Sequence, residues 1–546
     1  MTHPLSNLLI ERVATSLKRQ SITTPSKWAQ SYRQMKNGPW RFTQYPWLRE
    51  MHDSKAPINV GKKAAQLGYT ETVLNIAFYN IDVLARDVLY VLPNRTPDAS
   101  DFSASRFDPA LEMSPHLSNL FSNVKNIGHK RAGMANLYIR GSQSRAGLKS
   151  IPVAVVVLDE IEEFNAEAIP LAMERASGQT EKNIWMISTP SVEDVGIDLQ
   201  FKNSTQEHFF FKCPSCDKYI ELQWPDNFTV AEGNSGSFIK CNLCQAHLPH
   251  ANKAEWLKTG IWVPSVAAGN AAATIRGFYI NQLYSPTVTP EEFAAKYQAS
   301  LTNPADEQEF YNSKLGLTHA VKGARLNDED ITKCIGATGT PALAQPVLCT
   351  MGVDVGAFLH YEIDQWQINR ELKTSDINNE CTLTVLEAGK VNDFEQLDDL
   401  MQRYNIRCCV IDAQPERRKA KEFASKYPGR VYLCFYGKGI TGKQINVHTD
   451  PAEPLITVDR TSWLDLSLSR FRNGTIRLPA TIDWEYRSHL RAPIRWYRKD
   501  KNGNPVAEYR HDNKPDHYAH ARNYAEIALP FAANLARSYD IHTPRF

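Results

Sequence analysis

The sequence predicts an α/β protein with two units built on parallel β-sheets, the first of which carries a small metal-binding insertion. Three observations predict this class. The stretch Val153–Phe164 is a continuous apolar run that ends in a block of carboxylates, as expected for a parallel strand buried on both faces. Two later apolar segments, 347–353 and 407–411, are each followed by an aspartate. Between these regions, two Cys-x-x-Cys pairs have the spacing of a metal-binding ribbon.

Length and composition fit a cytoplasmic protein of two or three domains. At 546 residues the chain is too long for one ordinary core, and its 42% hydrophobic and 22% charged residues are typical of a soluble globular protein. The 62 Lys and Arg nearly cancel the 60 Asp and Glu, so overall charge neither favours nor excludes a nucleic-acid partner. No apolar run approaches the roughly 20 residues of a membrane span, and the amino terminus lacks the apolar region of a signal peptide. We therefore expect no membrane partner, and cysteines that are thiols or metal ligands rather than disulfides.

The first 40 residues are expected to form a helical arm. Apolar residues recur there at helical spacing, with an interruption at Ser21–Pro25. Two interpretations stay open for this arm, a plain packing helix and an element that docks a partner.

Asp159 and Glu160 follow the apolar run directly. Because ligands bind at the carboxyl ends of strands in open α/β sheets, these two side chains are expected at a functional edge. In a nucleotide-hydrolysing site, a first acid holds Mg²⁺ and a second polarises the attacking water. A buried strand followed by a solvated acidic turn would give the same pattern, so this stretch alone leaves both interpretations open.

The segment Ile58–Glu71 predicts a strand, a turn of small residues and a helix that opens at a hydroxyl, an arrangement that cradles phosphates. Its two lysines, Lys62 and Lys63, lie before Gly68 rather than after it, so the usual phosphate-loop consensus does not match. A lysine can still reach the β- and γ-phosphates from the first half of such a loop, and Thr70 has the place of a metal-binding hydroxyl. A solvated lysine pair in front of a helix is the alternative.

Two more apolar stretches, Val88–Pro93 and Ile184–Pro190, are predicted to be buried strands. The second ends in Ser188 and Thr189, small polar residues that can sense a γ-phosphate. Because strands alternate with helical stretches through this region, we expect a parallel sheet of βαβ units.

Four cysteines have the spacing of a zinc ribbon. They form two Cys-x-x-Cys pairs, made of Cys213, Cys216, Cys241 and Cys244. Each pair would hold one side of a tetrahedral ion, whereas a redox dithiol would need only one pair. We predict a structural Zn²⁺ site, because four cysteines leave no open coordination position for catalysis.

A second catalytic region is predicted from three aspartates. Asp354 and Asp412 each end an apolar strand, and Asp516 begins a helical segment. Acids at the ends of two neighbouring strands and on a carboxy-terminal helix can converge on two Mg²⁺ or Mn²⁺ ions, which activate water and stabilise the leaving oxygen of a phosphodiester. This is the layout of the ribonuclease-H-like fold. Each acid taken alone has the simpler interpretation of a strand-end cap.

Three further side chains in this region are weaker candidates. Glu362 and Glu387 could supply a fourth metal ligand. His517 could carry a proton, although a plain surface histidine is the preferred interpretation.

A basic, aromatic hairpin is predicted just before the last of these acids. Between Arg487 and Arg510 there are seven Lys or Arg against two acids, interleaved with aromatic residues, and Lys501–Asn504 has the composition of a hairpin turn. Such a hairpin suits phosphate contacts without base reading. We expect the DNA-contacting side chains to be Arg495, Arg498, Lys499 and Lys501. A solvated edge hairpin blunted by charge is the alternative.

These motifs together resemble the large terminase subunit of tailed phages, specifically the lambda-like GpA class. The resemblance lies in Lys63–Glu71, in Ala146–Ser150 before Leu158–Glu160, and in Ser188–Pro190. That family uses a deviant phosphate loop of the form K-x-A-Q-x-G-x-T-E, and it carries a zinc ribbon at this place. One departure is that Trp47–Glu50 lacks the glutamine that helps to hold adenine in the family; Gln44 is the candidate substitute.

The resemblance assigns roles to the residues of the first region. It implies that Lys63 is the phosphate lysine in a loop with Gly68, and that Thr70 and Asp159 hold Mg²⁺. Glu160 would then be the catalytic carboxylate. Ser188–Pro190, with Ser188 and Thr189, would be the motif that couples hydrolysis to movement.

The resemblance also implies a function, cofactors and partners. It implies a P-loop ATPase that translocates double-stranded viral DNA into the procapsid, and a metal-dependent nuclease that cuts concatemeric DNA. The implied cofactors are ATP, Mg²⁺ or Mn²⁺, and Zn²⁺. The implied partners are double-stranded DNA, a small terminase subunit, the portal protein of the procapsid and further copies of the chain in a ring, all in the host cytoplasm.

The expected organisation is a helical arm at 1–40, an ATPase domain at 41–335 with the zinc ribbon at about 208–250, a linker at 336–346, a nuclease domain at 347–535 and a tail at 536–546. Two other classes of function stay open. One is a helicase or recombinase ATPase with an accessory nuclease, which should show further arginine-rich motifs after Ser188–Pro190; we find none. The other is a non-catalytic docking component of a packaging machine.

Overall fold

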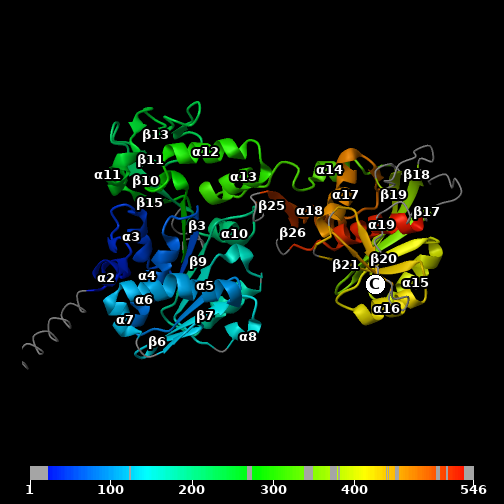
Figure 1. Cartoon of the computed structure of the whole chain (residues 1–546), viewed down its shortest axis with the longest axis horizontal. Coiled ribbons are helices and arrows are strands. Elements are labelled where there is room, and N and C mark those ends of the chain that lie inside the picture. The colour runs from blue at the N-terminus through cyan, green and yellow to red at the C-terminus, as the bar shows by residue number, and fades with distance from the viewer. Residues whose placement is uncertain are drawn as a thin grey trace, which may run out of the picture. The chain divides into compact units, whose positions relative to one another are not determined.

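The computed structural model shows two compact units, Met1–His319 and Ala320–Phe546, each organised around one large sheet (Figure 1). It describes residues 22–121, 124–149, 151–165, 167–266, 274–336, 348–368, 378, 381–437, 439–440, 442–448, 454–499, 504–511 and 514–533. In these ranges no helix combines the length and the apolar character that crossing a bilayer requires.

Unit 1 is built on a mixed sheet with a parallel centre. Across its described residues the strand order is β11-β10-β16-β3-β9-β8-β4-β7-β6-β5, with β15 paired to β10. The strands from β10 to β7 run parallel to one another, which confirms the predicted parallel sheet. The central strands are β3 Ile58–Lys63, β4 Val88–Leu92, β7 Ala135–Gly141, β8 Val155–Asp159, β9 Asn183–Ser188, β10 Glu207–Lys212 and β16 Ile275–Ile280. The outer strands are β5 Val124–Asn126, β6 His129–Ala132, β11 Tyr219–Ile220 and β15 Ile261–Pro264.

Helices cover this sheet and short elements connect it. They are α2 Pro25–Tyr32, α3 Trp47–His52, α4 Tyr69–Asp82, α5 Ser100–Phe102, α6 Asp108–Met113, α7 Pro115–Leu120, α8 Arg145–Leu148, α9 Ala168–Met173, α10 Gly196–Lys202, α11 Lys253–Trp256, α12 Pro290–Ser300 and α13 Pro304–Glu309. A two-stranded ribbon, β1 Gln34–Met35 and β2 Gly38–Pro39, follows α2.

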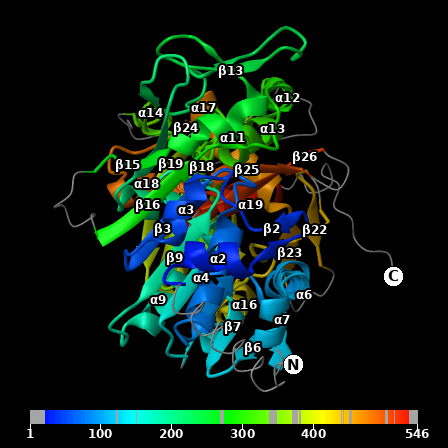
Figure 2. The ribbon, with the colours of Figure 1, turned by 90° about the vertical axis from the view of Figure 1, so that its left-hand side faces the viewer.

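The described part of the predicted arm packs into unit 1. Helix α2 begins at a Thr24 cap, whose hydroxyl accepts the N–H of Lys27, and it lies against α4 (Figure 2). Trp28 is fully buried and donates its indole N–H to Asp82 at 2.9 Å. Residues 22–40 therefore form a helix that packs on unit 1, followed by the β1–β2 hairpin. For this part of the arm, the structure agrees with the interpretation of a plain packing helix. Residues 1–21 lie outside the described residues.

The four cysteines sit in a small ribbon that leaves the end of β10. Its three-stranded sheet consists of β12 Phe228–Thr229, β13 Phe238–Lys240 and β14 His247–Leu248. Trp224 packs against Phe228 and Phe293, so the ribbon is anchored on helix α12 of the same unit.

Unit 2 is built on a second mixed sheet, whose order in the described residues is β22-β23-β21-β20-β17-β18-β19-β24. Strands β17, β20, β21 and β23 run parallel, while β18 lies antiparallel between β17 and β19. The strands are β17 Leu348–Val355, β18 Leu359–Ile368, β19 Cys381–Val391, β20 Cys408–Asp412, β21 Val431–Tyr436, β22 Ile445–Val447, β23 Leu455–Val458 and β24 Ile476–Arg477. A separate hairpin pairs β25 Ile494–Lys499 with β26 Pro505–Arg510.

Helices pack on both faces of this second sheet. They are α14 Asp328–Thr332, α15 Phe394–Arg403, α16 Arg417–Ser425, α17 Arg460–Asn473, α18 Trp484–Arg491 and α19 His517–Ala532. Alternate residues of β17, such as Met351 and Val353, join the core formed with α15 and α16. The opposite face meets α19 at Gly352, where a Cβ atom would lie 2.0 Å from the Ala521 carbonyl oxygen. A glycine is therefore required for α19 to lie directly on the strand that carries Asp354.

The boundary between the units differs from the expected position at 335. Unit 2 begins at Ala320, and Ile331 of α14 is buried in its core. Ile335 bridges Leu478 in the same unit. The sequence offered no signal here, because a short amphipathic helix beside a linker carries no mark of which domain it packs on. Residues 337–347, most of the predicted linker, and the tail 536–546 lie outside the described residues.

Candidate active sites

Three neighbouring strands of unit 1 bring the first set of predicted residues to one edge. Strand β9 lies between β3 and β8, with Lys62 opposite Ser188 and Ile187 opposite Asp159. Because all three strands are parallel, their carboxyl ends meet at the same edge of the sheet. The lysine, acidic and hydroxyl motifs, which are far apart in the sequence, therefore converge as predicted.

Lys63 sits at the centre of this group. Its buried ammonium donates to Glu160 Oε1 at 3.1 Å and to Thr189 Oγ1 at 3.5 Å. Ser188 donates its hydroxyl to the other Glu160 oxygen at 3.2 Å. Lys63, Glu160, Ser188 at the end of β9 and Thr189 just after it thus form one connected cluster.

The second lysine of the pair has a different role. Lys62 alternates to the opposite face of β3, where it pairs with the buried Asp198 at 2.6 Å and lies over the Phe201 ring. Neither lysine is a solvated surface charge, which removes the simpler interpretation of the pair. Only Lys63 lines the cavity described below.

Asp159 is buried and has spare hydrogen-bonding capacity. Its Oδ2 accepts the Tyr90 hydroxyl at 2.6 Å, while its Oδ1 is buried without a hydrogen-bond partner. Burial raises the pKa of Asp159 to about 6, reinforced by the Glu160 charge and opposed by Lys63, by the Tyr90 hydrogen bond and by the nearby Thr70 hydroxyl. A bound cation would satisfy the unpaired oxygen and restore the charged form.

The backbone at Glu160 is unusual. Its φ of 60° and ψ of 51° lie in the left-handed region, which costs a non-glycine residue free energy and is most often found at functional sites. This conformation ends β8 and directs the Glu160 side chain toward Lys63. Asp159, the last residue of the strand, is buried. A solvated acidic turn does not describe this pair.

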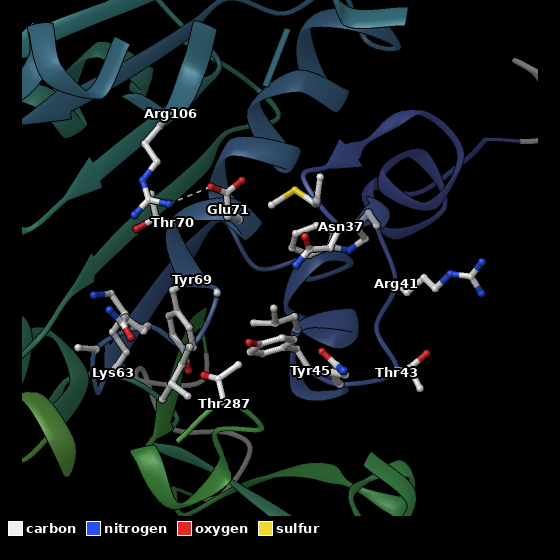
Figure 3. A pocket seen from close by; sticks show the side chains of 18 of the residues that line it. Asn37, Arg41, Thr43, Tyr45, Lys63, Tyr69, Thr70, Glu71, Arg106 and Thr287 are labelled. Carbon is white, nitrogen blue, oxygen red and sulfur yellow. Dashed lines mark hydrogen bonds and ion pairs between the residues drawn. The ribbon is translucent and has the colours of Figure 1, made fainter. Parts of the chain in front are cut away.

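A cavity of about 1030 Å³ opens over this cluster (Figure 3). Its floor is the Ala65–Glu71 segment, where β3 turns into α4 and the first N–H groups of the helix have no intrahelical partner. Gly68 has a φ of +85°, and a Cβ atom there would lie 2.6 Å from Leu48, so the turn requires glycine. Thr70 of this floor and Lys63 at the end of β3 both line the cavity.

The opposite wall of the cavity comes from residues before the motif strands. Gln44 and Tyr45 line it, as does Arg41. Arg106 reaches the rim, where its guanidinium lies 3.5 Å from Glu71 and its side chain is 57% exposed. The candidate adenine residue Gln44 therefore lies on the same cavity as the phosphate residues.

The four cysteines of the ribbon converge as predicted. The Sγ atoms of Cys213 and Cys244 are 3.9 Å apart, and those of Cys216 and Cys241 are 4.0 Å apart. A tetrahedral ion with Zn–S bonds of about 2.3 Å would place its sulfurs ~3.8 Å apart. Both Cys-x-x-Cys turns close in the same way, with the residue after the second cysteine in the left-handed region, at Asp217 and Gln245. All four thiols are free of disulfides, so the geometry fits a zinc ion.

In unit 2, two of the three predicted acids end neighbouring strands. Val353 pairs with Ile411 across β17 and β20, which places Asp354 and Asp412 one step further along in aligned positions. Burial raises the pKa of Asp412 to about 6, and the Asp354 charge adds to this effect, while the Gln414 backbone N–H, His520 and Tyr524 oppose it. Two carboxylates are therefore forced together at this edge of the sheet, as predicted.

The third acid lies at the start of α19 but is held away from a tight group with the other two. Asp516 Oδ2 lies 3.2 Å from His520 and 3.7 Å from Arg460. Burial alone would raise its pKa, but the nearby His520 imidazole and the charges of His511 and Arg460 outweigh burial and lower the pKa of Asp516 to about 2. The ligand atoms of the three acids do not all approach one another within 4.8 Å in the described structure.

Histidines complete a compact group that sequence reasoning missed. The ligand atoms of Asp354, His360 and His517 all lie within 4.8 Å of one another, and His517 Nδ1 is 2.9 Å from Asp354 Oδ2. The imidazole rings of His360 and His517 stack with their centroids 4.6 Å apart. His517 is therefore not a plain surface histidine, which was the preferred interpretation of the sequence. The available signal was the glycine turn after Asp354, which folds β18 back and places His360 directly opposite it.

The other two acids considered as fourth ligands are not available. Glu362 is fully buried, where it accepts hydrogen bonds from Arg522 and Tyr486, both at 2.7 Å. Glu387 accepts the hydroxyls of Tyr361 and Tyr404. These carboxylates belong to structural networks, and the sequence pattern of acids on strands could not distinguish them from metal ligands.

Two family models match the chain, and together they span both units. Residues 34–262 match "Phage terminase large subunit gpA, ATPase domain", and residues 275–538 match "Terminase large subunit gpA, endonuclease domain". The chain belongs to the gpA family of phage terminase large subunits. As a terminase large subunit it is an ATPase that drives packaging of phage DNA and a metal-dependent endonuclease that cuts it, which confirms the predicted resemblance and function.

Structural comparison of this terminase subunit returns other large terminases. The large terminase of a thermophilic bacteriophage is 10% identical, covers 90% of this chain and 99% of its own, and has a TM-score of 0.31. The ATPase domain of Thermus phage P74-26 large terminase is 12% identical over 52% of this chain and 98% of its own, with a TM-score of 0.32. The large terminase nuclease of the thermophilic phage G20c is 14% identical over 33% and 81%, with a TM-score of 0.21. No curated protein sequence matches the chain. The family assignment rests on the two domain models.

The basic hairpin of the terminase is present, but its charges are not all free. Arg495 is held by both carboxylate oxygens of Asp465, at 2.7 and 2.9 Å, so its guanidinium braces the hairpin against α17. Arg498 keeps a side chain that is 57% exposed beside Glu508. Lys501 lies outside the described residues, as does the side chain of Lys499. Of the predicted DNA contacts in the described part, Arg498 alone presents an exposed cation.

Proposed function

We propose that the cavity of unit 1 is the ATP site that drives packaging, with Lys63 as its phosphate lysine. One observation carries this proposal: the Lys63 ammonium joins Glu160 and Thr189 beneath a cavity whose floor is the start of α4. Exposed N–H groups at a helix start and a buried ammonium beside them form a site for a polyphosphate. Gly68 allows the turn at this floor, because a side chain there would clash with Leu48.

Each side chain of the ATP site has a distinct task. Thr70 and Asp159 would hold Mg²⁺, which when bound neutralises the charge on the β- and γ-phosphates. Glu160 orients the attacking water and takes its proton, and Lys63 balances the negative charge that develops on the γ-phosphate. Ser188 and Thr189 lie between these groups, where they can pass a change at the phosphate to strand β9.

The adjacent lysines provide a matched test of the ATP site. We expect Lys63→Met to weaken binding of a non-hydrolysable ATP analogue with Mg²⁺ by about 10- to 100-fold, because a charge-assisted hydrogen bond contributes about 1.5–3 kcal/mol. Isothermal titration calorimetry on the full chain measures this effect.

Lys62→Met is the control for that experiment. It removes the cation at Asp198 Oδ1 while Lys202 stays 3.1 Å from Oδ2, and should lower the free energy of unfolding by about 1–3 kcal/mol, with nucleotide affinity unchanged in the folded protein. If Lys62→Met weakens nucleotide binding and Lys63→Met does not, the assignment of the phosphate lysine is wrong.

We propose that the ribbon holds one structural Zn²⁺ through its four cysteines. The ion would fix the loops that carry the two turns, since no open coordination position remains for chemistry. Elemental analysis of the purified chain should find one zinc per chain, and Cys244→Ser should lose it and lower the melting temperature. Cys349→Ser, which changes a buried cysteine of unit 2, should keep the full zinc content. A full zinc content in Cys244→Ser would contradict the site.

The cutting site of unit 2 is proposed around Asp354 and Asp412, with Asp516 at the start of α19. Bound divalent ions would supply an activated water and stabilise the leaving oxygen of the phosphodiester. Asp354 lies on the central strand, so its carboxylate can be shared between ligands on either side. Asp516 Oδ2 is buried without a hydrogen-bond partner in the described structure, 3.2 Å from His520 and 3.7 Å from Arg460, so its carboxylate would have to turn away from these side chains to take part directly.

We propose further that this subunit works as a ring on the portal of a procapsid in the host cytoplasm, translocating double-stranded DNA delivered with a small terminase subunit. The joining of an ATPase and an endonuclease in one family chain supports this assembly. Arg498, followed in sequence by Lys499 and Lys501, is proposed to contact DNA phosphates near the cutting site, because phosphate contacts need cations but no base reading.

A further inference from the structure

The endonuclease site contains imidazoles beside its central aspartate. Asp354 ends the strand β17, which lies between β20 and β18 in the sheet. Asp412 stands on the β20 side, and His360 pairs directly with Asp354 on the β18 side. Helix α19 adds His517 to the same side. The aspartate therefore has a carboxylate neighbour on one flank and two histidines on the other.

The histidine flank has the dimensions of a metal position. The ligand atoms of Asp354, His360 and His517 all lie within 4.8 Å of one another. Two ligands on opposite sides of one ion, each at about 2.1 Å, would be ~4.2 Å apart, so three atoms in this range can share one ion. The two imidazole rings stack with their centroids 4.6 Å apart, and both lie beside the Asp354 carboxylate.

His360 gives an independent indication of a ligand. Its side chain is only 4% exposed, and its Nδ1 is buried without a hydrogen-bond partner in the described structure. A buried polar atom without a partner is costly, and coordination of an ion by the imidazole would offset that cost; His489 Nδ1 is also buried without a partner, but His489 does not belong to the three-ligand group. The next acid along this face of β18, Glu362, is neutralised by Arg522 and does not compete for the ion.

We propose that the endonuclease holds one of its metal ions between Asp354, His360 and His517, with the imidazoles as direct ligands. This inference rests on the proposed role of Asp354 in the cutting site. Asp354 would then bridge two metal positions, one toward Asp412 and one toward the histidines. The arrangement gives the site a preference, because imidazole ligands favour first-row transition ions over Mg²⁺. We expect Mn²⁺ to occupy the histidine position at concentrations at least about tenfold lower than Mg²⁺.

Electron spin-echo spectroscopy of Mn²⁺ tests this ligand set directly. The full chain is loaded with Mn²⁺ without nucleotide or DNA, and ¹⁴N modulation from coordinated imidazole is recorded. We expect this modulation in the wild-type protein, and a loss or clear reduction in His360→Gln and in His517→Gln. His489→Gln is the matched control: His489 lies beside His517, with ring centroids 5.5 Å apart, but outside the three-ligand group, so its variant should keep the signal.

The outcomes separate this inference from the proposed nuclease site. Mn²⁺ binding without ¹⁴N modulation, or modulation unchanged in both His360→Gln and His517→Gln, overturns the inference and favours a purely hydrogen-bonded Asp354–His517 pair. Because His517 is partly exposed, its variant keeps the test valid if His360→Gln does not fold. Asp412→Asn tests the nuclease site separately: it should abolish DNA cleavage while the ¹⁴N modulation persists. Cleavage that survives in Asp412→Asn would count against the proposed nuclease site and leave the histidine assignment standing.

Discussion

Replacement of Glu160 by glutamine is expected to reduce DNA-stimulated ATP hydrolysis by about 10²- to 10⁴-fold, the usual contribution of a positioned general base. The amide keeps the shape of the side chain, and its oxygen can still accept the Lys63 hydrogen bond while its NH₂ group faces the Ser188 hydroxyl, but it cannot take a proton from water. Binding of ATP should therefore persist while turnover is lost. Phosphate release measured with and without DNA, together with nucleotide binding by calorimetry, gives both quantities.

The same turn supplies a control for Glu160→Gln. Glu163 is exposed three residues further along and does not line the cavity, so Glu163→Gln should hydrolyse ATP at the wild-type rate. Thermal unfolding must be compared for both variants, because Glu160→Gln removes the charge partner of the buried Lys63 ammonium, whereas Glu163 is exposed. Wild-type turnover in Glu160→Gln would show that another group activates the water, and the role proposed for Glu160 would be wrong.

Much of unit 1 could be predicted from sequence because its motifs are tied to strand ends. The apolar run before Asp159 predicted β8, and the parallel sheet then fixed where Lys63 and Ser188 had to meet it. The cysteine spacing predicted the ribbon without any knowledge of the fold. What the sequence could not show was which of two adjacent lysines faces the cavity, since this depends on the pleat of β3 and on the buried Asp198.

Unit 2 shows where pattern reasoning ends. The strand-end acids Asp354 and Asp412 were predicted because each follows an apolar run. His360 was missed because its place depends on the register of an antiparallel pair, which only the folded hairpin defines. The ion pair of Arg495 was missed for a similar reason: the basic run was visible, but its partner Asp465 is distant in sequence and meets it only in the packed structure.

Asp354→Asn is expected to abolish endonuclease activity while sparing ATP hydrolysis. Outer-shell partners of metal ligands are typically responsible for 10- to 100-fold effects, so loss of a shared ligand should lower the rate of cleavage by more than about 10²-fold. Linearisation of supercoiled plasmid in Mn²⁺ measures this rate, and phosphate release from the same samples measures the ATPase. The ATPase should be unchanged, because its proposed residues all lie in unit 1.

An exposed aspartate of the same unit, Asp399, provides the control for the loss of DNA cleavage expected in Asp354→Asn. Asp399 lies on α15, which packs on the other face of the sheet from α19, so Asp399→Asn should cut DNA normally. Asp354 is buried, and removing its charge weakens its hydrogen bond with His517, so a thermal melt must show that unit 2 stays folded. Cleavage by a folded Asp354→Asn protein would mean that the ions are held elsewhere, and both the acid pair and the histidine position would have to be abandoned together.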